Sequence, residues 1–181
     1  MILPRIYPRL LVLALAAPLL AGCAQSQYVP EYAFYPQPAA VEVANPTGPQ
    51  NRQVPLTVLA NVLGIRNADP NSHIPYSVAI RLRFENNGPS RVVFDPRTLE
   101  LTNGELRAFP PPQTDPGRVL VSAPGERKEL TAYFPFPPGT TARDWDLKRL
   151  RLRWRVNIND YPVLQTAYFE RGQPREEAAD Y

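Results

Sequence analysis

The chain has 181 residues, with 20 lysines and arginines, 17 aspartates and glutamates, 23 prolines and one cysteine. This length provides for a single hydrophobic core and leaves no room for a second large domain. The prolines argue against long helices, because each interior proline costs about 3 kcal/mol there. A lone cysteine excludes an internal disulfide.

The N-terminal segment has a basic part and then an apolar part. Arg5 and Arg9 precede the run LLVLALAAPLL (10–20). That run is shorter than the ~20 apolar residues that span a bilayer, so residues 1–22 are expected to be a secretory signal that is removed. Removal leaves 18 basic residues against 17 acidic ones, and this near balance gives no reason to expect nucleic acid as a partner.

The residues at the expected cleavage site are Leu20, Ala21, Gly22 and Cys23. They resemble the bacterial lipobox, in which a large apolar residue and two small ones precede a cysteine. The resemblance implies acylation of Cys23 and anchoring of the protein in a membrane of the bacterial cell envelope by its acyl chains. Ala24 favours the periplasmic side of the outer membrane if the cell is Gram-negative. An ordinary signal peptide with an incidental cysteine is the alternative.

The next segment, residues 23–51, is rich in proline, alanine and glutamine and lacks sustained periodicity. It is expected to be a tether that reaches about 80 Å as polyproline II and about 30 Å as a flexible coil. Its aromatic residues exceed what a spacer needs, so docking on the domain or on a partner is an open alternative for Tyr28, Tyr32, Phe34 and Tyr35.

The range 52–170 consists of short extended segments separated by turn residues. In YSVAIRLRF (76–84) apolar residues alternate with Ala79, Arg81 and Arg83, which is typical of a strand. Asn103-Gly104 predicts a type I′ hairpin turn between TLELT (98–102) and ELRAF (105–109). Other extended segments are expected at VPLTVLANVLGI (54–65), RVVF (91–94), RVLVS (118–122), KELTAYFPF (128–136), 146–158 and YPVLQTAYF (161–169). A polar, disordered tail is expected at 171–181.

Three segments resemble immunoglobulin-like domains of bacterial lipoproteins: VAIRLRFENNG (78–88), TLELTNGEL (98–106) and APGERKELTAYFPFP (123–137). The resemblance spans about 54–170. It implies a single all-β, immunoglobulin-like antiparallel β-sandwich, here of about seven strands, with an extracytoplasmic binding or scaffolding role. Fold alone carries no mechanism.

The segment RLRLRWRV (149–156) places arginines at alternate positions. Arg149, Arg151, Arg153 and Arg155 would share one face of a strand over about 20 Å, opposite Leu150, Leu152, Trp154 and Val156. Guanidinium groups bind phosphate and carboxylate in bidentate fashion. The four arginines are therefore a candidate site for anionic envelope glycans or lipid headgroups.

The alternative is an ordinary solvent face whose charges are neutralised by neighbouring strands. A two-residue turn at Asn159-Asp160 would place Arg149 opposite Glu170, Arg151 opposite Tyr168 and Arg153 opposite Thr166, giving one ion pair and one arginine–aromatic stack. A strand on the other flank could contribute Glu100, Glu129 or Glu85.

No set of residues indicates catalysis, a metal ion or a cofactor. The exported chain contains one histidine, His73, in a loop, and no methionine, which removes the ligands that copper and zinc prefer. Asp144 and Asp146 are expected to cap turns. A catalytic triad would need His73 with Ser72, Ser90 or Ser122, and no nucleophile-elbow motif is present.

We therefore expect a non-enzymatic, lipid-anchored module that binds or scaffolds other envelope proteins through sheet edges or loops. The alternative is a module that binds anionic envelope glycans or lipid headgroups through the arginines at 149–155. A glycan hydrolase is a remote alternative, because the spatial arrangement of its carboxylates is invisible in the sequence.

Overall fold

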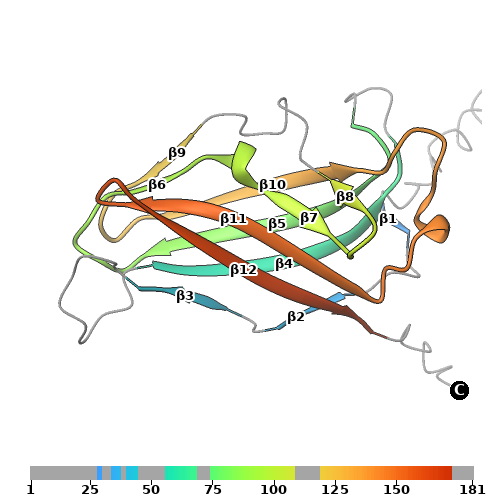
Figure 1. The fold of residues 1–181 in the computed structure, drawn as a ribbon. Helices are drawn as coiled ribbons and strands as arrows, with labels where there is room; N and C mark the ends of the chain where they lie inside the picture. The colour runs from blue at the N-terminus through green and yellow to red at the C-terminus, as the bar shows by residue number, and fades with distance from the viewer. Residues whose placement is uncertain are drawn as a thin grey trace, which may run out of the picture.

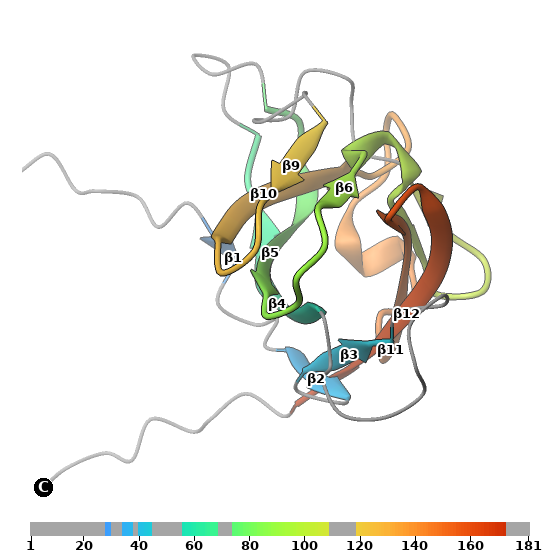
Figure 2. The same ribbon diagram turned by 90° about the vertical axis from the view of Figure 1, so that its left-hand side faces the viewer.

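The computed structural model describes residues 28–29, 34–37, 40–44, 56–68, 74–108 and 119–172. These residues form two antiparallel sheets packed face to face (Figures 1 and 2). The expected all-β, immunoglobulin-like antiparallel sandwich is confirmed, but the described residues form twelve strands where about seven were expected. No helix within the described ranges is long and apolar enough to cross a bilayer.

The first sheet, which we call sheet A, is built on three long strands: β4 (Leu56–Arg66), β5 (Ser77–Asn86) and β10 (Arg127–Pro135). Two short strands, β1 (Tyr28–Val29) and β3 (Val41–Val43), pair with the two ends of β4. In β5 the expected alternation is confirmed, because Val78, Ile80, Leu82 and Phe84 are buried and Arg81 is exposed.

The second sheet, sheet B, has the long hairpin of β11 (Arg149–Ile158) and β12 (Tyr161–Arg171) at its centre. β2 (Phe34–Gln37) extends it beside β12. On the other flank of β11 lie β6 (Val92–Phe94) and β7 (Glu100–Thr102), which pair in turn with β9 (Leu120–Ser122) and β8 (Arg107–Ala108). Two 3₁₀ helices, η1 (Pro96–Thr98) and η2 (Ala142–Asp144), connect strands.

The core lies between the sheets and is formed by the inward residues of both. Its largest fully buried side chains include Trp154 and four phenylalanines, of which Phe84 in sheet A and Phe94 in sheet B have ring centroids 4.5 Å apart. Burying one such side chain contributes about 1.5–3 kcal/mol. This core makes the sandwich a rigid support for its two outer faces.

The expected tether is wrong where the structure describes it. Residues 34–37 and 41–43 are strands, and Phe34, Val41 and Val43 are buried in the core. Pairing satisfies backbone groups at the edges of β12 and β4, and it removes apolar side chains from water. The domain therefore begins before residue 52. The lipobox residues 20–23, Tyr32, His73 and residues 173–181 of the expected tail lie outside the described residues.

The two predicted hairpin turns have different outcomes. Asn159 and Asp160 have φ of 51° and 66° and join Ile158 directly to Tyr161, which confirms the two-residue turn. The prediction of a type I′ turn at Asn103-Gly104 is wrong. Gly104 has positive φ but Asn103 does not, and strand pairing resumes only at Arg107. The Asn103 carboxamide accepts hydrogen bonds from the backbone N–H groups of Glu105 and Leu106, which widens the turn.

Candidate functional site: the outer face of sheet B

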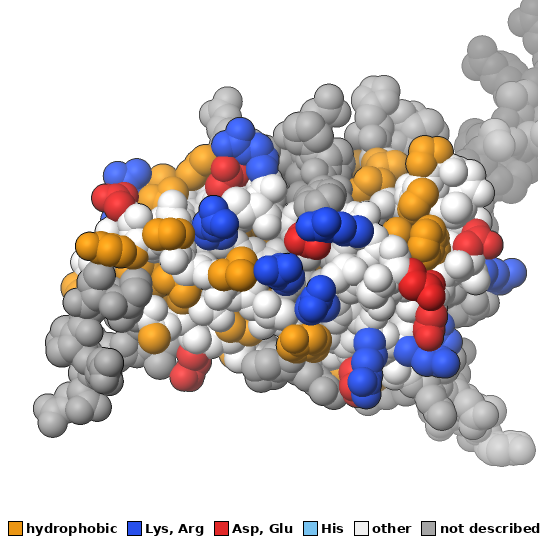
Figure 3. Space-filling model, viewed as in Figure 1, with side chains coloured by type: hydrophobic (Ala, Val, Ile, Leu, Met, Phe, Trp, Pro, Cys, Tyr) orange, Lys and Arg blue, Asp and Glu red, His pale blue; other side chains and the backbone are white. Residues whose placement is uncertain are grey.

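The predicted arginine strand is β11, and its register with β12 is the one expected. Arg149 lies opposite Glu170, Arg151 opposite Tyr168 and Arg153 opposite Thr166. The intervening Leu150, Leu152, Trp154 and Val156 are at most 1% exposed, so the arginines point away from the core. Figure 3 shows basic side chains in a diagonal row that follows β11 across this face.

Ion pairing neutralises only part of this row. Arg149 Nε lies 3.2 Å from Glu170 Oε1, as expected. Glu100 is the register partner of Arg153, but its carboxylate oxygen lies 2.7 Å from Nε of Arg107 on β8. The proposed partners Glu85 and Glu129 are wrong, because both belong to sheet A. In the part of the chain that the structure describes, Arg151, Arg153 and Arg155 make no ion pair.

Exposed apolar side chains share this face with the arginines. Tyr168 is 53% exposed beside Arg151, Leu164 is 55% exposed beside Arg155, and Tyr35 of β2 is 53% exposed beside Glu170. The expected stack of Arg151 on Tyr168 is not observed; among the described residues the cation–π contact is that of Arg66 with Tyr133, on sheet A. Arginines and apolar groups therefore both remain open to solvent.

We call this surface the arginine face. It comprises five arginines, two glutamates and three exposed apolar side chains: Arg107, Arg149, Arg151, Arg153, Arg155, Glu100, Glu170, Tyr35, Leu164 and Tyr168. Sequence reasoning missed Leu164, Arg107 and Tyr35 as members. The hairpin register already placed Leu164 opposite Arg155, whereas the position of Arg107 depends on a turn that was predicted incorrectly.

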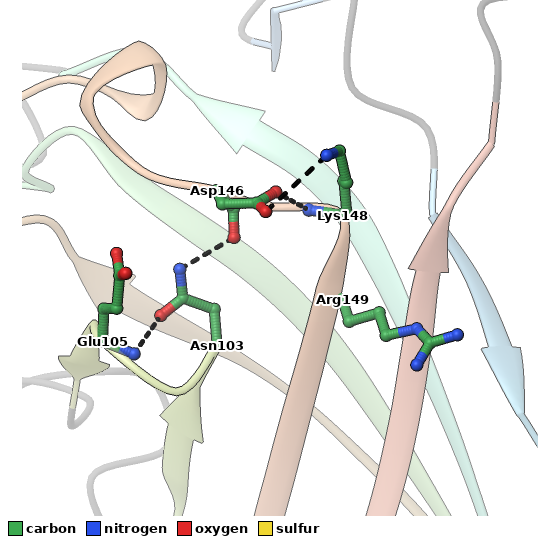
Figure 4. A pocket seen from close by; sticks show the side chains of 5 residues that line it. All are labelled: Asn103, Glu105, Asp146, Lys148 and Arg149. Atoms are coloured by element: carbon green, nitrogen blue, oxygen red, sulfur yellow. Dashed lines mark hydrogen bonds and ion pairs between the residues drawn. The ribbon is translucent and has the colours of Figure 1, made fainter.

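A small groove of about 450 Å³ adjoins the Arg149 end of the face and is lined by Asn103, Glu105, Asp146, Lys148 and Arg149 (Figure 4). Asn103 Nδ2 donates to the Asp146 carbonyl at 2.8 Å, and Asp146 Oδ1 accepts from the Lys148 backbone N–H at 3.0 Å. In Figure 4 the Arg149 guanidinium points away from the other four side chains. The groove's polar groups thus serve the local turns.

The two aspartates that flank Trp145 cap turns, as expected. Asp144 forms a capping box with Thr141 at the start of η2, and Asp146 accepts from the Lys148 N–H. Within the described ranges no three histidine, cysteine, aspartate or glutamate side chains gather as metal ligands. The arginine face is therefore the candidate that remains.

Comparisons with known proteins add little to this geometry. No family model matches the chain, and no curated protein matches it. One similar solved structure is a protein provisionally named ApaA from Bordetella pertussis. It is 22% identical, with 66% of this chain and 94% of that chain covered and a TM-score of 0.38. Function is therefore argued from the arginine face.

Proposed function

We propose that this protein is a non-enzymatic, lipid-anchored binding or scaffolding module of the bacterial cell envelope. Acyl chains on Cys23 hold it on the periplasmic side of the outer membrane if the cell is Gram-negative. The sequence Leu20-Ala21-Gly22-Cys23 supports the anchor, since two or more acyl chains give stable attachment. The observation that carries the binding role is the arginine face.

The composition of that face supports binding. Arginine and tyrosine are enriched at the centres of protein interfaces. The β-strands that carry Arg151, Arg153 and Tyr168 are backed by the core, so their positions are set before a partner arrives. Other envelope proteins would be met here or at sheet edges.

A second candidate ligand class is an anionic envelope glycan or lipid headgroup. It is favoured by one specific observation, namely that Arg151, Arg153 and Arg155 make no ion pair within the described residues. Such cations are available for phosphate and carboxylate groups.

Two measurements test the proposed function. Mass spectrometry of the N-terminal peptide from membranes should find an acylated Cys23, and an unmodified thiol would contradict the anchor. Crosslinking in intact cells from a photoreactive group at Thr166, on the arginine face, should capture envelope components more efficiently than the same group at Thr131 on the outer face of sheet A. Equal capture would contradict the assignment of the binding surface.

A third measurement addresses the remote alternative of a glycan hydrolase. Incubation of the purified protein with dye-labelled peptidoglycan should release no dye above the background of a heat-denatured sample. Release above background would contradict the non-enzymatic assignment.

A further inference from the structure

We propose that the arginine face docks on the anionic phospholipid headgroups of the membrane that holds the anchor, so that the domain lies with sheet B against the bilayer. This inference rests on the proposed acylation of Cys23 and names the ligand of the same face. It replaces the picture of a module held at a distance by a long tether.

Only a short length of chain separates Cys23 from the first strand of the fold. β1 begins at Tyr28, whose Cα pairs with Arg66 at one end of β4. The segment from Cys23 to Tyr28 spans at most about 18 Å when fully extended. An acylated Cys23 therefore keeps β1 within that distance of the headgroups, well short of the 30–80 Å estimated for a tether.

The same short segment leads to the end of the domain where the arginine row begins. β1 belongs to sheet A, and Figure 2 shows it across the sandwich from β11 and β12. Figure 1 shows β1 at the end of the sandwich where β12 finishes, and Arg149 begins its row there, opposite Glu170. The anchor and the arginine row are thus joined at one end of the domain.

The arginine face combines cationic and apolar side chains. Arg151, Arg153 and Arg155 make no ion pair within the described residues, and guanidinium groups bind phosphate oxygens in bidentate fashion. Tyr168 and Leu164, each more than half exposed, lie opposite Arg151 and Arg155 on β12. Tyrosine favours the headgroup level of a bilayer, where its ring and hydroxyl both find suitable surroundings.

This mixture favours a lipid surface over a soluble glycan. A glycan would be bound by the cations but would give the exposed Leu164 no apolar environment. A bilayer interface accommodates phosphate contacts and apolar side chains together. Electrostatic attraction to the headgroups falls off within about 8 Å at physiological ionic strength, and the short segment after Cys23 keeps the domain near the membrane.

The test uses the full acylated chain in vesicles, with one cysteine introduced for a fluorophore. Thr166→Cys places the label beside Arg153 on the arginine face, and Thr131→Cys places it beside Arg81 on the outer face of sheet A. Both threonines are half-buried, so the two labels start from similar exposure to solvent. The chain's only natural cysteine is Cys23, which the acyl group protects.

Brominated lipids report which face lies on the membrane. In vesicles that contain phosphatidylglycerol, the label at 166 should be quenched several-fold more than the label at 131. In vesicles of phosphatidylcholine alone this difference should shrink. Equal quenching of the two labels in anionic vesicles would overturn the inference, and crosslinking of position 166 to an envelope protein would then assign the arginine face to a protein partner.

Matched variants identify the groups responsible. Arg151→Gln, Arg153→Gln and Arg155→Gln together should shift the docking equilibrium by about 100-fold toward the undocked state and remove the difference in quenching. Arg81→Gln, Arg83→Gln and Arg127→Gln together remove the same number of charges from sheet A. This second variant should keep the difference in quenching between the two labels. Tryptophan fluorescence without brominated lipid, to which the buried Trp154 and the partly buried Trp145 contribute, checks that both variants fold. Equal behaviour of the two triple variants would overturn the inference.

Flotation separates failure of this inference from failure of the proposed function. The acylated chain should float with phosphatidylcholine vesicles whether or not the face docks. A chain that floats but shows no preferred face overturns only the docking. A chain that does not float overturns the anchor and, with it, this inference.

Discussion

The outer faces of the two sheets carry similar arginine strands in different surroundings. On sheet A, Arg81 lies 3.2 Å from Glu129, Arg83 lies 3.2 Å from Glu85, and Arg127 lies 3.0 Å from Glu85. On sheet B, Arg151, Arg153 and Arg155 make no ion pair within the described residues. Alternation of arginines in a strand is therefore insufficient to mark a binding surface.

Neighbouring strands account for the difference. Glu129 comes from β10 and Glu85 from β5 itself, so sheet A supplies its own carboxylates. The strands beside β11 supply Thr102, Thr166, Tyr168 and Leu164, and the carboxylate of Glu100 pairs with Arg107. The charge that remains on sheet B is thus decided by which strands are adjacent.

The largest expected effect is a difference in stability between substitutions on the two sides of β11. Trp154 is fully buried between the sheets, so Trp154→Ala should lower the free energy of unfolding by about 3–5 kcal/mol. Arg153→Gln, on the outer side, should change it by less than about 0.5 kcal/mol. Urea denaturation followed by far-UV circular dichroism measures both, and similar losses for the two would contradict the division between core side and binding side.

A second prediction concerns the connection between the sheets. Asn86, 1% exposed at the end of β5, donates from Nδ2 to the carbonyls of Ser90 (2.8 Å) and Ser122 (3.1 Å), and Ser122 belongs to sheet B. Asn86→Ala should lower the free energy of unfolding by about 2 kcal/mol or more, because the buried Ser122 carbonyl and the part-buried Ser90 carbonyl lose their donor. Asn87→Ala is the control. Asn87 is an exposed neighbour whose Nδ2 donates a hydrogen bond to Thr57 Oγ1, and its replacement should lower the free energy of unfolding by less than about 0.5 kcal/mol. Equal costs in chemical denaturation would exclude this role.

The two triple arginine variants should also differ in stability. Exposed ion pairs contribute between 0 and about 1 kcal/mol each, so Arg81→Gln, Arg83→Gln and Arg127→Gln together should destabilise the protein by about 1 kcal/mol. The corresponding change at Arg151, Arg153 and Arg155 should leave stability unchanged or raise it, because like charges repel along the row. The difference in denaturation midpoint should shrink with added salt, and a difference that is independent of salt would exclude ion pairing as its cause.

The smallest effect is expected from acid, and it involves turns that belong to neither face. Hydrogen bonds from Arg97 lower the pKa of Asp95 from its usual 3.8, and the Ala123 N–H, followed by Lys128, lowers the pKa of Glu126 from 4.5. Both carboxylates bind fewer protons in the folded state than in the unfolded state. The stability that they contribute to folding is therefore fully present when the pH is above their usual pKa values, and it is lost as the pH falls through their lowered pKa values in the folded state. Denaturation midpoints should be flat above about pH 5 and decline below about pH 4, with a weaker decline in Asp95→Asn.

Local patterns in the sequence predicted much of the fold and most of the arginine face. The type I′ turn at Asn159-Asp160 sets the register of β11 and β12, because a two-residue loop leaves one pairing. It therefore placed Glu170, Tyr168 and Thr166 opposite their arginines. The strands β1, β2 and β3 were missed, since segments so short carry no periodicity, and Pro36 argues against a strand unless it lies at an edge.

The sequence by itself determined that β11 would have one apolar side and one cationic side, because residues alternate across a strand. It also determined the pairing across a tight hairpin. Only the tertiary structure decided that Arg151, Arg153 and Arg155 would form no ion pair within the described residues, because Glu85 and Glu129 belong to sheet A and Glu100 binds Arg107. Contacts between residues distant in the chain depend on how the sheets assemble, and no local pattern of residues contains that information.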